Sequence, residues 1–151
     1  MKELLFRGNS LDDLRKFPAL AMREAGYQLD KVQNCNEPTD EGAAMKIGQR
    51  FSSVWDAIEN TPQQAASMRA RSALMMELES IIKRRDMTQA EAAALFGVTQ
   101  PRVSDLMRGK INLFSLDCLM DMATAAGLDP QVTIKKPKVP SNRRDDVRTA
   151  A

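Results

Sequence analysis

The chain has 151 residues, and its 22 Lys+Arg nearly balance its 20 Asp+Glu. This length suits one ordinary domain with appendages, and no apolar run approaches the roughly 18 residues of a membrane span. The chain has no histidine, and its two cysteines lack metal-binding spacing, so we expect neither an enzyme nor a bound metal or cofactor. Glu3 and Arg7 interrupt the start, where a signal peptide would be apolar, and this favours a cytoplasmic protein.

The first 36 residues predict one strand and two helices. Glu3 to Phe6 is a strand candidate, Ser10 caps a helix through Lys16, and Pro18 begins the second helix. The apolar face of that second helix includes Leu20, Ala21, Ala25 and Leu29. So few short elements bury little surface, and we expect a small extension. The composition then turns to Asn, Glu, Pro, Asp and Gly, so residues 37–50 are interpreted as a linker.

A second apolar segment and a long helix come next. The apolar residues of the segment are Phe51, Val54, Trp55 and Ile58. They form a patch that either packs on the following helix or binds a partner. Thr61 caps that helix, which runs to about Arg85 and turns Leu74, Leu78 and Ile81 inward.

Residues 88–110, TQAEAAALFGVTQPRVSDLMRGK, predict two helices that cross at a tight turn. Thr88 and Glu91 form a capping box at the start of the first, Gln89 to Phe96. Ala93 is small where the second helix crosses, and Gly97 supplies the left-handed conformation that ends the first helix. The pattern favours a helix-turn-helix, with an ordinary antiparallel helix pair as the alternative.

The second motif helix runs from Gln100 to about Arg108. Thr99 caps it, while Val103 and Leu106 face the core. A helix held in this way enters the major groove of DNA. The residues expected to read bases are Gln100, Arg102, Ser104 and Asp105. Those expected to contact the DNA backbone are Gln89, Thr99, Arg108 and Lys110.

The remaining elements are a helix, a short strand and a tail. Leu113 and Phe114 cover the core, and Ser115 caps a helix through about Ala126. The inward residues of that helix are Leu116, Leu119, Met120 and Ala123. Val132, Thr133 and Ile134 belong to an alternating segment that predicts a strand, which pairs with its copy in a homodimer or remains an extended tail. Residues 137–151 are polar and are expected to be disordered.

Charge is distributed unevenly along the chain. Residues 1–60 hold 8 Lys+Arg against 10 Asp+Glu, whereas residues 61–151 hold 14 against 10. The basic half contains the helix-turn-helix motif, where cations would attract DNA phosphates.

Residues from about Phe51 to Lys136 resemble the antitoxins of HigBA-type toxin–antitoxin pairs, in the lambda-repressor-like Xre family. The resemblance rests on the stretches SVWDAIENTP, TQAEAAALFGVTQPRVSDLMRGK and FSLDCLMDMATAAGL. It implies a DNA-binding domain that represses its own operon as a dimer and also binds a partner toxin.

The first 36 residues resemble the amino-terminal piece of the toxin itself, the HigB branch of the RelE-like ribonucleases. The stretches GNSLDDLRKFP and AMREAGYQLDKVQ carry this resemblance. The chain departs from the toxin pattern at Asn36, before the residues that attack RNA, so no ribonuclease activity follows. The segment is interpreted as a truncated toxin fused to an antitoxin that began near Met45, with an unrelated helical extension as the alternative.

The expected fold is mainly α. A four-to-five-helix lambda-repressor-like domain occupies residues 51–136, with a short dimerisation strand at its end and a strand-plus-two-helices extension before it. The expected function is sequence-specific repression of a toxin–antitoxin operon through an inverted-repeat operator. The alternative is a protein-interaction module that neutralises a RelE/HigB-like toxin through Phe51, Val54, Trp55 and Ile58.

Overall fold

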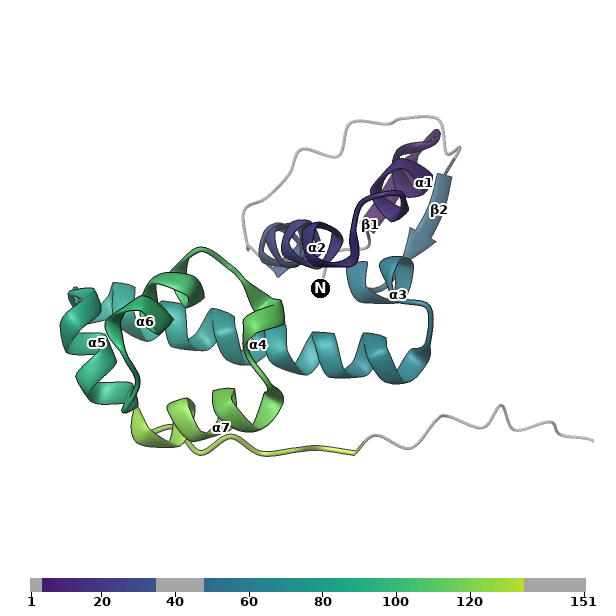
Figure 1. Ribbon diagram of the computed structural model, residues 1–151. Helices are drawn as coiled ribbons and strands as arrows, with labels where there is room; N and C mark the ends of the chain where they lie inside the picture. Colours follow the sequence, from purple (N-terminus) through teal and green to yellow (C-terminus); the bar gives the residue numbers. More distant parts are fainter. Residues whose placement is uncertain (1–3, 35–47, 135–151) are drawn as a thin grey trace, which may run out of the picture.

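The computed structural model describes residues 4–34 and 48–134, and this part of the chain is mainly helical (Figure 1). The elements in chain order are β1 (Leu4–Arg7), α1 (Ser10–Arg15), α2 (Ala19–Asn34), β2 (Gly48–Phe51), α3 (Val54–Ile58), α4 (Pro62–Arg84), α5 (Gln89–Phe96), α6 (Gln100–Met107), the 3-10 turn η1 (Ile111–Leu113) and α7 (Leu116–Ala125). The expected mainly α, lambda-repressor-like fold is confirmed.

The long helix α4 forms the axis of the molecule. Helix α2 lies on one side of it and α7 on the other, and α5 and α6 gather at its carboxyl end (Figure 1). Its start is fixed by Thr61, whose hydroxyl accepts a hydrogen bond from the Gln64 amide at 3.2 Å. Leu78 and Ile81 are buried as expected, and Leu74 is half-buried against the same core.

A two-stranded antiparallel sheet joins the amino terminus to the segment before α3. Leu4 of β1 lies opposite Phe51 of β2, and Arg7 lies opposite Gly48. The rings of Phe6 and Phe51 meet edge to face, with centroids 6.1 Å apart. Residues 48–50 therefore belong to a strand, and the linker interpretation of residues 37–50 missed it. Residues 35–47 lie outside the described part of the chain.

The N-terminal segment buries far more surface than the sequence suggests. Helix α2 covers α3 so closely that a Cβ on Gly26 would lie 2.5 Å from the Ile58 side chain. Trp55 is completely buried beneath it, and so is Tyr27 of α2 itself. The expected apolar face of α2 is only partly correct, because Leu20 and Ala21 are exposed. The buried face of α2 consists of Gly26, Tyr27, Asp30 and Gln33.

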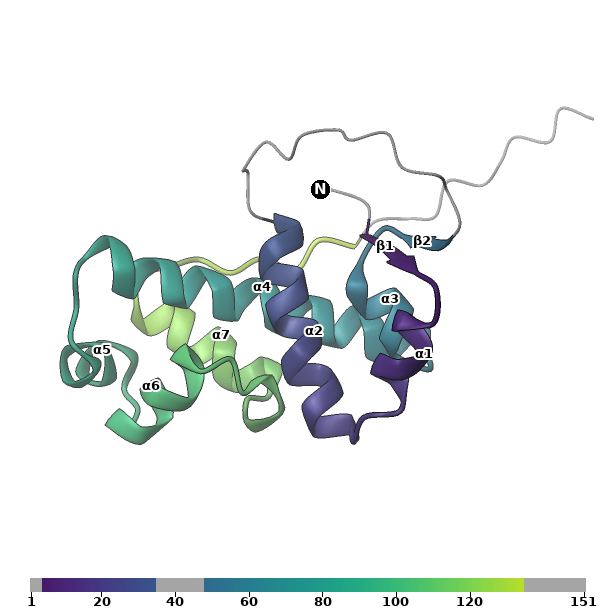
Figure 2. The same cartoon turned by 90° about the horizontal axis from the view of Figure 1, so that it is seen from above.

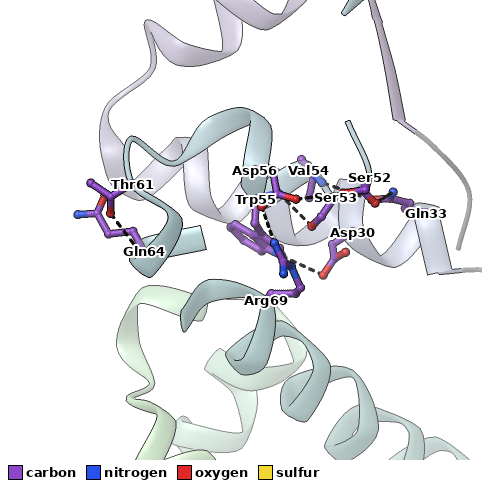
Figure 3. A network of polar contacts seen from close by, with 10 residues as sticks. All are labelled: Asp30, Gln33, Ser52, Ser53, Val54, Trp55, Asp56, Thr61, Gln64 and Arg69. Carbon is purple, nitrogen blue, oxygen red and sulfur yellow. Dashed lines mark hydrogen bonds and ion pairs between the residues drawn. The ribbon is translucent and has the colours of Figure 1, made fainter. Parts of the chain in front are cut away.

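A buried polar network holds α2 to α4 and to α3, and Figure 3 shows the contacts with Trp55 and Ser52. The Asp30 carboxylate accepts hydrogen bonds from the Trp55 indole at 3.0 Å and from the Ser72 hydroxyl. Gln33 donates to the backbone carbonyl of Ser52 at 2.8 Å. A buried carboxylate is tolerated only when such donors compensate for its lost hydration, so this contact specifies how α2 docks.

A second network ties α2 to the middle of α4. The Tyr27 hydroxyl donates to Glu79 at 2.6 Å, and Lys31 pairs with the same carboxylate at 2.7 Å. Burial, together with the hydrogen bond and charge of Glu79, raises the pKa of Tyr27 far above its usual range. Tyr27 therefore stays protonated and remains a donor at every physiological pH.

One expectation for the C-terminal half needs correction, and the expected dimerisation strand stays a prediction. Phe114 is fully buried as expected, but the Leu113 side chain is 46% exposed, because η1 turns it away from the core. Residues 131–134 form no strand within this single chain, and Val132 and Ile134 are 75% and 87% exposed. Residues 137–151, expected to be a disordered tail, lie outside the described residues.

Candidate nucleic-acid interface

The first motif helix, α5, begins at the expected capping box. The Thr88 amide donates to the Glu91 carboxylate at 2.7 Å, and the Glu91 amide donates to the Thr88 hydroxyl at 3.3 Å. The backbone hydrogen bond from Thr88, followed by that from its side chain, lowers the pKa of Glu91. The capping contribution is therefore present above the unfolded-state pKa of Glu91 and is lost as the pH falls through the lowered value.

The tight turn between α5 and α6 has the predicted geometry. Gly97 adopts the left-handed conformation at a φ of 67°. The Val98 amide then bonds to the carbonyl of Ala93 at 3.0 Å, and Ala93 is buried where the two helices meet. These contacts fix the direction in which α6 leaves the turn.

Helix α6 is anchored along one side. Val103 and Leu106 are both completely buried. At 100° per residue, the opposite side of the helix carries Pro101, Ser104, Asp105 and Arg108. Pro101 and Arg108 are exposed, and Ser104 and Asp105 are half-buried. The outer face of α6 is thus open among the described residues, as insertion into a groove requires.

The expected base-reading residues do not all lie on that outer face. Gln100 is exposed on one flank of α6, and Arg102 lies on the other flank, nearer α7. The Arg102 guanidinium stacks over the Phe114 ring, 4.6 Å from its centroid, and approaches the Cys118 sulfur at 4.0 Å. The structure therefore groups Ser104 and Asp105 and sets Arg102 apart from them.

Of the expected backbone-contacting residues, Thr99 lies at the start of α6, Arg108 and Lys110 lie at its end, and Gln89 begins α5. Gln89, Thr99 and Arg108 are exposed, and Lys110 is half-buried. Thr99 occupies the N-cap position, but its side chain makes no capping hydrogen bond, which corrects that expectation. Lys110 pairs with Asp105 at 3.3 Å, so a cation offsets the one carboxylate on the outer face of α6.

Two residues near this surface were not singled out from the sequence. Pro101 was assigned only a place in the first turn of α6, yet it is exposed and lies on the outer face. No sequence pattern indicates a role for Asn112, because its contacts are with α2, which lies far away in the sequence.

The apolar patch proposed for toxin binding is not an accessible surface. Val54 and Trp55 are completely buried, Ile58 is 2% exposed and Phe51 is half-buried. Helix α2 lies over α3, and β1 pairs with β2, so the chain's own amino-terminal segment covers this patch. In this chain the patch is therefore part of the core, because residues from another part of the chain cover it.

Among the described residues, no cluster of three or more Cys, Asp or Glu side chains could hold a metal ion. No helix there is both long and apolar enough to cross a membrane.

The comparisons with known proteins agree with this geometry. The family model described as a helix-turn-helix domain matches residues 57–135, which is just over half of the chain. The match begins within α3 and includes all of α4 to α7. No match was found among curated proteins. The chain therefore belongs to the helix-turn-helix domain family.

Proposed function

We propose that the protein is a sequence-specific DNA-binding repressor of a toxin–antitoxin operon. The observation that supports this best is helix α6, which is anchored by Val103 and Leu106 and open on its opposite face. An anchored helix with a free polar face suits the major groove, where base edges differ in their donors and acceptors. Repression then follows from occupancy, because the bound protein blocks the promoter.

Residues on the outer face and flanks of α6 have different roles in this proposal. Ser104, Asp105 and Gln100 meet base edges, with Pro101 against a methyl group. Backbone contacts come from Gln89 and Thr99 at helix amino termini and from Arg108 and Lys110 after α6. The contacts with the backbone set the register, and those with the bases give the preference for sequence.

A homodimer on an inverted-repeat operator completes the proposal. Two copies of α6 would then lie about 34 Å apart, one turn of B-DNA. Val132, Thr133 and Ile134 are exposed, which supports a segment that pairs with its own copy. Across a two-fold axis, the backbone groups of such a segment can bond to the same segment of the second chain.

A footprint of the full chain on the DNA upstream of its own gene tests this function. Two protected half-sites with inverted sequence, separated by one helical turn, are the expected result. Uniform protection of the whole fragment at every concentration would instead indicate nonspecific binding.

Arg102→Ala is expected to weaken binding to every sequence by a similar factor and to lower the salt slope by about one. The guanidinium stacks on Phe114 at the flank of α6, which suits a phosphate better than a base. Titrations of specific and random duplexes at several salt concentrations measure both quantities. Arg69→Ala, in the amino-terminal half of α4, is the matched control. A loss confined to one operator position would make Arg102 a base-reading residue, as the sequence alone suggested.

Direct neutralisation of a toxin is not part of this proposal. The surface expected for it is covered by residues of β1 and α2, as described above. The toxin–antitoxin context rests on the resemblance of residues 51–136 to HigBA-type antitoxins, and the partner proposed here is the operator DNA.

A further inference from the structure

The turn that follows α6 is held by contacts with α2, an element outside the helix-turn-helix motif. The Asn112 side-chain amide donates to the backbone carbonyl of Leu20 at 3.2 Å. Arg23 donates to the Asn112 carbonyl oxygen at 3.5 Å. The early turns of α2 lie beside the segment that joins α6 to α7 (Figure 2).

A second contact lies at the beginning of the same turn. Gly109 is buried and adopts a φ of 74°. A Cβ at this position would lie 2.7 Å from the ring of Tyr27 and 2.7 Å from the side-chain nitrogen of Gln28. The backbone of the turn can approach α2 this closely only because glycine has no side chain. Helix α2 therefore contacts the turn at both Gly109 and Asn112.

Helix α2 is itself firmly attached to the rest of the fold. Arg23 makes two hydrogen bonds to the Glu59 carboxylate, at 2.7 and 3.1 Å, and Tyr27 bonds to Glu79 of α4. A paired guanidinium and carboxylate of this kind fix orientation as well as distance. The turn after α6 is therefore connected through α2 to both α3 and α4.

The two proposed phosphate contacts lie next to Gly109, at the start of this turn. Arg108 precedes Gly109, and Lys110 follows it. Both proposed phosphate contacts therefore belong to the backbone segment that α2 contacts. Binding to DNA costs less free energy when such a segment is already ordered in the free protein.

We infer that α2 is a positioning element of the DNA-binding site, and that Asn112 is the positioning residue that holds the turn of Arg108 and Lys110 in its binding geometry. This inference rests on the proposed DNA-binding function. It gives the N-terminal segment a role in that function, although the segment lies outside the residues matched by the helix-turn-helix family.

Asn112→Ala in the full chain tests the inference. Asn34→Ala is the matched control, because Asn34 also donates from its side chain to a backbone carbonyl, that of Asp30 at 2.9 Å, but at the far end of α2. We expect Asn112→Ala to weaken binding to specific and random duplexes alike, by about three- to tenfold, since the hydrogen bond to the Leu20 carbonyl and the long one from Arg23 are both lost. The control is expected to bind DNA as the unaltered chain does.

Hydrogen exchange in the free protein separates positioning from direct contact with DNA. The amides of Lys110 and Leu113 bond to Asp105 and Lys110 carbonyls at 3.1 and 3.0 Å, and both should exchange faster in Asn112→Ala. Unchanged affinity overturns the inference, and so does weaker binding without faster exchange, which would make Asn112 a direct contact. If the unaltered chain shows no sequence preference, the proposed function itself fails instead.

Discussion

Trp55→Ala is expected to lower the free energy of unfolding by about 3–5 kcal/mol. The indole is completely buried between α2 and α4, and its N–H donates to the buried carboxylate of Asp30 at 3.0 Å. The substitution therefore leaves a cavity and also removes one donor from a carboxylate that water cannot reach. Urea unfolding of the full chain, followed by circular dichroism, measures the loss.

Phe17→Ala is a suitable control for this experiment, because the Phe17 side chain is 55% exposed and its removal leaves no buried cavity. We expect a change within about 0.5 kcal/mol for this variant. A loss of under about 1 kcal/mol for Trp55→Ala would contradict the fold described here, because it would mean that the N-terminal segment does not cover α3 in solution.

Gly109→Ala is expected to cost about 2–4 kcal/mol of unfolding free energy, considerably more than Gly97→Ala. Both glycines have a positive φ, 74° and 67°, so a side chain at either position incurs the left-handed penalty of about 1–2 kcal/mol. At Gly97 a Cβ would meet nothing within 4 Å, whereas at Gly109 it would lie 2.7 Å from the buried Tyr27 ring. The difference in unfolding free energy between the two variants therefore measures the packing of α2 on the turn.

Thermal or urea unfolding of the two variants side by side measures this difference. Equal losses for Gly109→Ala and Gly97→Ala would contradict the close approach of α2 to the turn. Tyr27 cannot easily move aside, because its hydroxyl is bonded to Glu79 and its ring is completely buried.

The helix-turn-helix region could be predicted from the sequence because its signals are local. The Thr88–Glu91 capping box, the left-handed Gly97 and the Ser115 cap each act over three or four residues, and the structure places all of them as expected. The same locality explains why α4 to α7 begin and end within a residue or two of their predicted bounds.

The structure of the N-terminal segment could not be predicted from local signals, since the residues that it contacts are distant in the chain. Asp30 and Gln33 are polar, so the apolar pattern indicated only part of the side that α2 buries. Their burial is favourable only because Trp55, Ser72 and Ser52 supply partners. Strand β2 is likewise a four-residue segment that gains its structure from pairing with β1.

These long-range contacts also changed the functional interpretation. Trp55 and Ile58 were candidate partner-binding residues as long as nothing was known to cover them, and α2 shows them to be core. Arg102 was grouped with the base-reading residues by its position in α6, whereas its stacking on Phe114 separates it from Ser104 and Asp105.

Equilibrium titration of the full chain tests the central claim most directly. The operator duplex found by footprinting is compared with a duplex of scrambled sequence and equal composition, each at two stated salt concentrations. The account predicts a preference for the operator of about a thousandfold or more, retained at the higher salt. Equal affinity for the two duplexes at both salt concentrations would contradict it.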